Sequence, residues 1–379
     1  MKRILRASTA LVGLAGAASA EITFSGDAEL FYTFDGEQID DAGTVTSDDN
    51  LEWSADFNIR FSQELDNGIT AGVDWEIDFV DDNQGNDLSA SDFLLSLTSE
   101  QANLFFGDTE FAAVNVFSGV TDMAADNFSE ADGEDVLRGE VTAFGWNVQI
   151  STFLLEDGQF LDATGADVAV GEDELEQLSV GVQGDIGPVN VILAYQEDFL
   201  PDGAESAVNG DFNTDEIFAV ALSATFAGAD ITLAYADNEV GDSTGIEVSY
   251  PVTDAVTITG FYVAETVDAD DASAPDGYGV TVDYVQGPIV AQVFYSDTGG
   301  EEDYGLDVDY DLGNGITLKG GYAEGDGSDD GFYVGAAYDL GAGAELRFIY
   351  VDADNLNTDD EYFGDDDPEG ATLSLSFAF

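Results

Sequence analysis

Carboxylates are by far the most numerous reactive side chains in this sequence. Its 379 residues include 80 Asp and Glu, only 7 Lys and Arg, no His and no Cys. Pairs of carboxylates can hydrolyse glycosides, but with so many acids such pairs arise by chance. Histidine is the commonest general base and metal ligand, so its absence argues against hydrolytic and metal-centre chemistry. The composition therefore predicts a protein that is not an enzyme.

The same composition limits the ligands. Binding of nucleic acid needs Lys and Arg to displace counterions, so we expect no nucleic-acid partner. The acidic runs Asp326–Asp330 and Asp365–Asp367 could bind Ca²⁺, a cation that takes carboxylate oxygens. The spacing of an EF-hand is absent. We therefore favour solvated acidic loops without a cofactor, and keep Ca²⁺ at these loops as the alternative.

Residues 1–20 have the pattern of a secretory signal peptide. Lys2, Arg3 and Arg6 precede a short apolar run, which ends at the small residues Ala18–Ala20. The run is too short to span a bilayer as a helix, and such a segment is cleaved after export. We expect residues 21–379 to form a single domain with a formal charge of 4 − 80 = −76. Its four basic residues are Arg60, Arg138, Lys319 and Arg347.

Polar and apolar residues alternate over much of this domain, and a period of two predicts β-strands. In LEWSADFNIRFSQEL, from Leu51 to Leu65, apolar side chains occupy every second position and polar side chains the positions between. The segment from Ile69 to Val80 repeats the pattern. By this parity, all four basic residues lie on the polar face of their strands.

The predicted strands form hairpins, with short turns at one end and longer acidic segments at the other. Gly, Asn, Asp and Pro supply the backbone angles of tight turns, and nine such turns can be located. Together with a first and a last strand, they give a count of about 20 strands. This layout is typical of an all-β, transmembrane, antiparallel up-and-down barrel. The longer segments are Asp35–Asn50, Thr109–Asp135, Glu156–Glu176, Glu197–Asp215 and Asp352–Glu369.

Tyrosines indicate that the apolar face meets lipid. A membrane barrel carries aromatic girdles at both interfaces, where a ring can lie half in lipid. Ten tyrosines lie near strand ends on the apolar parity, which favours a membrane barrel over a secreted, acidic, salt-adapted β protein. They are Tyr195, Tyr235, Tyr250, Tyr262, Tyr284, Tyr295, Tyr310, Tyr322, Tyr338 and Tyr350.

Three segments carry a resemblance to a known family. They are EITFSGDAELFYTF from Glu21, LFFGDTEF from Leu104, and the last strand ATLSLSFAF, which ends at Phe379. With these segments and its hairpins, the mature chain resembles the Gram-negative general porins, most of all those of alphaproteobacteria. The resemblance implies 16 strands, a homotrimer and a third long loop that constricts the pore. It also implies that Phe379 is part of the signal read by the outer-membrane assembly machinery.

The segment Thr109–Asp135 matches this constriction loop in position. The resemblance also implies basic residues on the wall facing the loop, so that Arg60, Arg138, Lys319 and Arg347 become candidates for that wall. The candidate acidic residues of the loop are Glu110, Asp122, Asp126, Glu130, Asp132, Glu134 and Asp135.

These observations predict an outer-membrane porin of a Gram-negative bacterium, a water-filled channel through which small hydrophilic solutes and ions diffuse passively. The alternative in the same membrane is a structural or adhesive barrel that does not conduct. Acids on the polar face outnumber the basic residues, so we expect the channel to prefer cations. These acids include Asp27, Glu29, Glu52, Asp56, Asp74, Glu76, Asp78, Asp283, Asp307 and Asp309.

Overall fold

The structure, a computed structural model, describes residues 20–39, 45–81, 86–89, 93–131, 134–155, 159–162, 165–168, 174–201, 204, 206–208, 212–267, 275–325, 330–354 and 369–379. The expected signal peptide lies almost wholly outside the described residues. Asp132 and most of the two acidic runs considered for Ca²⁺ also lie outside them.

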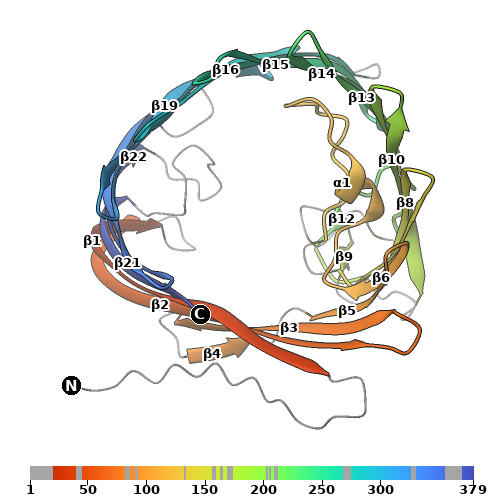
Figure 1. Cartoon of the computed structure of the whole chain (residues 1–379), viewed down its shortest axis with the longest axis horizontal. Helices are drawn as coiled ribbons and strands as arrows, with labels where there is room; N and C mark the ends of the chain where they lie inside the picture. The colour runs from red at the N-terminus through yellow and green to blue at the C-terminus, as the bar shows by residue number, and fades with distance from the viewer. Residues whose placement is uncertain are drawn as a thin grey trace.

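Antiparallel strands follow one another around a closed ring (Figure 1). Each strand pairs with the next along the chain, and β1 pairs with β23, where Asp27 lies opposite Ala378. Closure leaves no sheet edge, which a strand structure in lipid requires. The ring strands are β1 Glu21–Ile39, β2 Val45–Glu64, β3 Thr70–Asp81, β5 Phe93–Thr98, β6 Ala102–Gly107, β7 Val136–Ala143, β8 Trp146–Leu154, β10 Leu175–Ile186, β11 Val189–Gln196, β13 Ile217–Phe226, β14 Ala229–Asp237, β15 Gly241–Thr253, β16 Val256–Val267, β17 Gly277–Gln286, β18 Ile289–Thr298, β19 Glu301–Gly313, β20 Ile316–Gly325, β21 Asp330–Gly341, β22 Ala344–Asp354 and β23 Gly370–Ala378.

The ring has 20 strands in the described part of the chain, so the count from the turns is confirmed. The 16 strands implied by the resemblance are wrong for this chain. The additional hairpins are part of the wall, because their strands pair along their length with both neighbours; β19, for example, pairs with β18 and with β20.

The nine predicted short turns all connect neighbouring ring strands. At Phe144–Gly145 and Ala227–Gly228 both turn residues have positive φ angles, between 54° and 88°. Two such residues in succession give the turn whose twist matches paired strands. Gly145 and Gly228 adopt the second of these conformations without the steric cost of a side chain.

The acidic segment Asp35–Asn50, expected to be a loop, is mostly strand. Pairing between β1 and β2 continues until Ile39 lies opposite Val45. Backbone pairing does not depend on side-chain polarity, so a hairpin can extend beyond the part of the wall whose side chains are apolar.

Four short elements complete the described structure: β4 (Asn86–Ser89), α1 (Ala112–Val116), β9 (Phe160–Leu161) and β12 (Ser206–Ala207). Among the described residues, no helix has the length and apolar character needed to cross a membrane.

Apolar side chains face outward from the ring. Phe24 is 55% exposed, Trp75 45% and Val293 50%. A closed wall made of such exposed apolar side chains would be unfavourable in water. At strand ends on this face, Tyr235 donates a hydrogen bond to Asp237 (2.9 Å between oxygens). A phenol ring on the apolar wall with its hydroxyl on a carboxylate is suited to the boundary between lipid and water.

Candidate functional site

One segment, residues 109–135 between β6 and β7, lies inside the ring and is called the inner loop below. It contains α1 and lies alongside the wall formed by β8 to β16, while the opposite side of the ring, around β19 and β22, stays clear of it (Figure 1). The inner loop therefore occupies one side of the lumen, in the position that the resemblance implies for a constriction loop.

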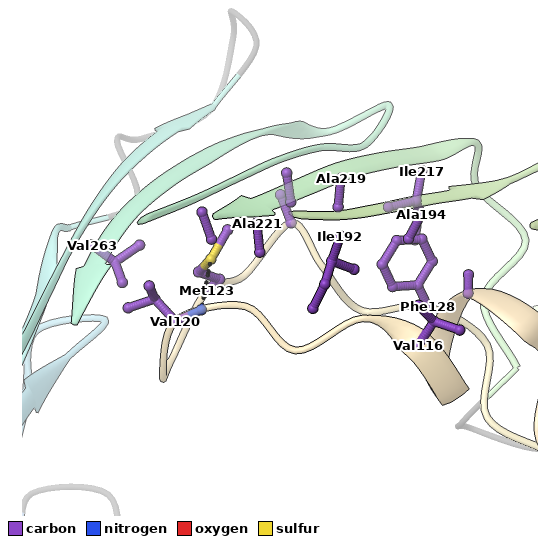
Figure 2. Close-up of a cluster of buried hydrophobic side chains, with 14 residues drawn as sticks. Val116, Val120, Met123, Phe128, Ile192, Ala194, Ile217, Ala219, Ala221 and Val263 are labelled. Carbon is purple, nitrogen blue, oxygen red and sulfur yellow. Dashed lines mark hydrogen bonds between the residues drawn. The ribbon is translucent and has the colours of Figure 1, made fainter. Parts of the chain in front are cut away.

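Apolar packing fixes the inner loop to the wall (Figure 2). Burying a Val, Met or Phe side chain contributes roughly 1.5–3 kcal/mol relative to leaving it exposed. Many of the wall residues are alanines, whose small side chains let the loop come close. From the loop the cluster contains Ala113, Val116, Val120, Met123, Ala125 and Phe128, and from the wall Ile192, Ala194, Ile217, Ala219, Ala221, Ala234, Ala236 and Val263.

Polar side chains of the wall accept hydrogen bonds from backbone N–H groups of the loop. The N–H groups of Ala112 and Ala113, in the first turn of α1, donate to the hydroxyls of Ser151 and Ser179, each at 2.8 Å. The first N–H groups of a helix have no partner within the helix. Both serines are buried, so they supply the acceptors that water would otherwise provide.

The far part of the loop is held in the same way. Ser129 N–H donates to Oε1 of Gln196 at 2.8 Å, and Ala125 N–H donates to the hydroxyl of Ser243 at 2.9 Å. The side chain of Gln196 is fully buried, and its Nε2 donates to the carbonyl of Asn213 at 3.0 Å. These bonds fix the loop along its length, not only at its ends.

A glycine lets α1 lie directly on the wall. A Cβ atom at Gly181 of β10 would lie 2.2 Å from the carbonyl oxygen of Ala112 and 2.6 Å from a methyl group of Val116. Any larger residue at this position would force the helix away from the wall and further into the lumen.

The loop begins in a second cluster, which is rich in phenylalanine. The rings of Phe111, Phe153, Phe160, Phe199 and Phe212 make edge-to-face contacts at centroid distances of 5.0 to 6.2 Å. Phe160, Phe199 and Phe212 belong to the connections between β8, β10, β11 and β13. These connections therefore pack against the base of the inner loop.

The predicted acidic residues of the loop differ in environment. Glu110, Asp122 and Glu130 are exposed, whereas Glu134 is buried. The surrounding protein partly desolvates the carboxyl of Glu110 and so raises its pKa, although the residue as a whole is exposed. Asp132 lies outside the described residues.

Two further loop carboxyls are partly buried. Burial raises the pKa of Asp126 to about 7, and the nearby carboxylate of Glu265 raises it as well. Burial also raises the pKa of Asp135. Asp126 is thus a loop carboxyl whose charge changes near neutral pH.

Arg138 lies at the base of the inner loop. Its Nη1 donates to the carbonyl of Glu110 at 3.0 Å, and Nη2 lies 3.4 Å from a carboxylate oxygen of Glu140. Its guanidinium also lies 5.1 Å from the ring centroid of Phe105. Since Arg138 is buried, its contacts are with the loop base and wall.

The other three basic residues lie on other parts of the inward wall. Arg60 on β2 lies 3.3 Å from Asp74, and Lys319 on β20 lies 3.7 Å from Asp309. Arg347 on β22 is separated from Lys319 by β21. Lys319 and Arg347 belong to the side of the ring that faces α1 across the lumen (Figure 1).

The last residue helps to close the ring. Phe379 N–H donates to the carbonyl of Gly26 at 2.9 Å, and Gly26 N–H donates back to Phe379 at 3.0 Å. The Phe379 side chain is 69% exposed and continues the outward parity of β23.

The sequence reasoning missed the residues that hold the loop, among them Ser151, Ser179, Gln196 and Ser243. A signal for them was present. The middle parts of β11, β13 and β14 are mostly apolar or small on both faces, although only one face of a pore wall meets lipid. A two-faced apolar strand indicates a wall that is covered on its inner side as well.

A closed antiparallel ring with an apolar outside and a loop folded into its lumen defines the class of membrane-spanning β-barrel channels. The sequence model of the Gram-negative porins matches residues 7–330, and the chain belongs to this family. It is thus an outer-membrane channel protein and not an enzyme.

Three similar proteins have low sequence identity to this chain. A porin of Rhodobacter capsulatus is 23% identical over 317 residues, which cover 81% of this chain and 95% of the relative. Two solved mutants of Rh. blastica porin are each 15% identical and cover 94% of this chain and 100% of their own, with TM-scores of 0.43 and 0.44.

Proposed function

We propose that this porin is a cation-preferring channel for passive diffusion of small hydrophilic solutes, narrowed by the inner loop. The preference rests on the pairing of the basic residues. Arg60, Arg138 and Lys319 each lie within 3.7 Å of a carboxylate of the wall, Asp74, Glu140 and Asp309 respectively. The remaining inward carboxylates then determine the sign of the field in the lumen.

The wall formed by β1 and β2 shows this excess most directly. Asp27 lies opposite Asp56 on the inward face, and Glu29 and Glu52 lie on the same face. Like charges at opposite positions of neighbouring strands are destabilising, and mobile cations in the lumen relieve the repulsion. Rings and rows of acidic side chains are the usual basis of cation selectivity.

The reversal potential in a KCl gradient across a planar bilayer tests the preference. We expect potentials of the sign for K⁺ over Cl⁻, reduced in the double variant with Asp27→Asn and Asp56→Asn. Asp254→Asn, in a short turn between β15 and β16, is the matched control and should leave the potential nearly unchanged. A preference for anions in the parent protein would contradict the proposal, and absence of conductance would favour the structural or adhesive barrel.

We propose that the inner-loop acids and the cations Lys319 and Arg347 on the wall across the lumen produce a transverse field, with part of the charge of Lys319 offset by Asp309. Exposed Glu110, Asp122 and Glu130 supply the negative side. Solutes with a dipole would then be oriented as they pass the narrow part.

The proposed assembly is a homotrimer, inserted by the assembly machinery through the strand that ends at Phe379. One feature of the wall supports association of subunits. β5 and β6 have six residues each, whereas a tilted strand needs about 9–11 residues to span the bilayer core. Strands this short do not span the bilayer core by themselves, so a neighbouring subunit is the expected cover of the wall at this point.

A further inference from the structure

The inward wall opposite the inner loop contains a hollow of about 340 Å³, formed by strands β17 to β22. The inward-facing residues that matter for its chemistry are Asp283, Phe294, Asp307, Lys319, Tyr333 and Arg347. Binding sites for small molecules range from about 300 to 1,000 Å³, so this hollow has the size for one small solute rather than a chain of sugars.

Glycines in the wall and the aromatic rings beside them form the floor of the hollow. A Cβ atom at Gly305 would lie 2.4 Å from the ring of Phe294, and one at Gly321 would lie 2.2 Å from the ring of Tyr333. Both rings therefore lie against bare backbone. Phe294 is only partly buried and offers an apolar surface, whereas Tyr333 is buried.

Hydrogen bonds position the two carboxylates of the hollow. The hydroxyl of Tyr333 donates to Asp307, and Nε2 of Gln292 donates to Asp283 at 3.0 Å. An ionised carboxylate accepts through both oxygens, at about four lone-pair sites. Each can therefore accept a further bond from a ligand.

The two cations can approach the same ligand group. Lys319 lies opposite Gly335, and Arg347 lies opposite Ala337, on the single strand between them. Because that strand carries a glycine and an alanine on its inward face, no large side chain separates the ammonium from the guanidinium.

The lining thus has two carboxylates and two cations, in a mature chain whose formal charge is 4 − 80 = −76. A simple anion would enter this acidic lumen against the field, and a simple cation would bind only the carboxylates of the hollow and make no use of Arg347 or of Lys319, which also lies 3.7 Å from Asp309. A solute that carries both charges and has no net charge matches both pairs.

We propose that this hollow binds an α-amino acid with an apolar side chain. Its carboxylate would bind Lys319 and Arg347, its ammonium group Asp307 or Asp283, and its side chain would lie on the ring of Phe294. The inference rests on the proposed function, since the solute reaches the hollow through an open lumen. The hollow then acts as a weak binding step on the diffusion path.

The test is the single-channel conductance in 1 M KCl as leucine is added, because the Debye length falls to about 3 Å at this salt concentration and long-range attraction is suppressed. We expect a saturable fall in conductance. Leucinamide, which lacks the carboxylate, and 4-methylpentanoate, which lacks the ammonium group, should each need roughly three- to fivefold higher concentration for half-saturation, the factor expected for one exposed ion pair.

Variants locate the binding. Arg347→Gln should raise the leucine concentration for half-saturation roughly three- to fivefold, measured relative to the KCl conductance of the same variant. Phe294→Ser removes the apolar surface under the leucine side chain and should raise this concentration as well. Arg60→Gln makes the same chemical change elsewhere on the inward wall and should leave the half-saturation unchanged. The proposal is overturned by a linear response to leucine, by equal affinity for either truncated analogue, or by an Arg60→Gln effect as large as that of Arg347→Gln. A channel that conducts KCl but shows no saturable response disproves only the hollow, whereas a protein that does not conduct disproves the proposed function itself.

Discussion

At the scale of single residues, charged side chains on the inward face of the wall differ in their burial. Arg138 and Arg60 both lie on the polar parity of a strand, yet Arg138 is buried at the base of the inner loop and the Arg60 side chain is 62% exposed. Parity predicts the face of the wall to which a side chain belongs. It does not tell whether that face is open to the lumen or covered by another segment.

Asp126 gives a prediction about pH. Its pKa in the folded protein is about 7, above the ordinary value of 3.8, because of burial and the nearby Glu265. The folded protein therefore binds this proton more tightly than the unfolded chain. The stabilising contribution is complete below about pH 4 and is lost as the pH rises through about 7.

We expect the inner loop to loosen as Asp126 ionises, so that open-channel current noise in the parent protein increases between about pH 6 and pH 8. Asp126→Asn removes this ionisation and should give low noise at both pH values. The matched control, Asp122→Asn, removes an exposed charge from the same loop and should keep the pH dependence of the parent. A parent protein whose noise does not change over this range would contradict the assignment.

At the scale of elements, the inner loop is held by the wall rather than by its own secondary structure. α1 has only five residues, and an isolated helix of this length would not be stable. Apolar contacts with β11, β13 and β14 and the buried hydrogen bonds to wall serines and Gln196 therefore determine its position.

Gln196→Ala should loosen the loop without opening the ring. The variant leaves the N–H of Ser129 without its acceptor in a buried site, at a cost of roughly 1–3 kcal/mol. We expect faster hydrogen exchange in residues 125–131 and larger current fluctuations. Gln183→Ala is the control, because Gln183 lies on the inward face of β10 in an exposed position, with a single side-chain bond to Asn190. Equal exchange rates in the two variants would show that Gln196 does not hold the loop.

At the scale of the whole molecule, the excess of carboxylates acts through a field that salt screens. The Debye length is about 10 Å at 0.1 M and about 3 Å at 1 M ionic strength. We therefore expect the preference for K⁺, measured as the reversal potential at a fixed KCl ratio, to weaken steadily as both concentrations rise. A preference that is the same at low and high salt would instead indicate local cation sites.

The low wall at β5 and β6 leads to a prediction about assembly. Leu95, Leu97 and Leu104 lie on its outward face, each more than 40% exposed in the single chain. Replacing Leu97 and Leu104 by Arg should weaken association, seen as a smaller particle in mild detergent by light scattering. The same change at Val280 and Val293, on the outward face of β17 and β18, serves as the control for insertion of charge into lipid. Particles of equal size in the two double variants would contradict an interface at β5 and β6.

The sequence by itself determined the closed strand architecture, because alternation of polarity along each strand and the residues of the nine tight turns are local properties. The pairing of β1 with β23 follows from these hairpins once the sheet must lose its edges. The strand number read from the turns was right, whereas the number taken from the resemblance was not, since strand number can differ between members of one fold.

Only the tertiary structure decided how the inside of the ring is arranged. Ser179 and Gln196 hold the inner loop across 66 and 67 residues of sequence, and no local pattern links such distant positions. The hollow beside Phe294 and Tyr333 also arises from glycines on neighbouring strands. Such sites depend on the register between strands and on side chains from distant segments that come into contact. The alternation of polarity along a single strand carries no information about either.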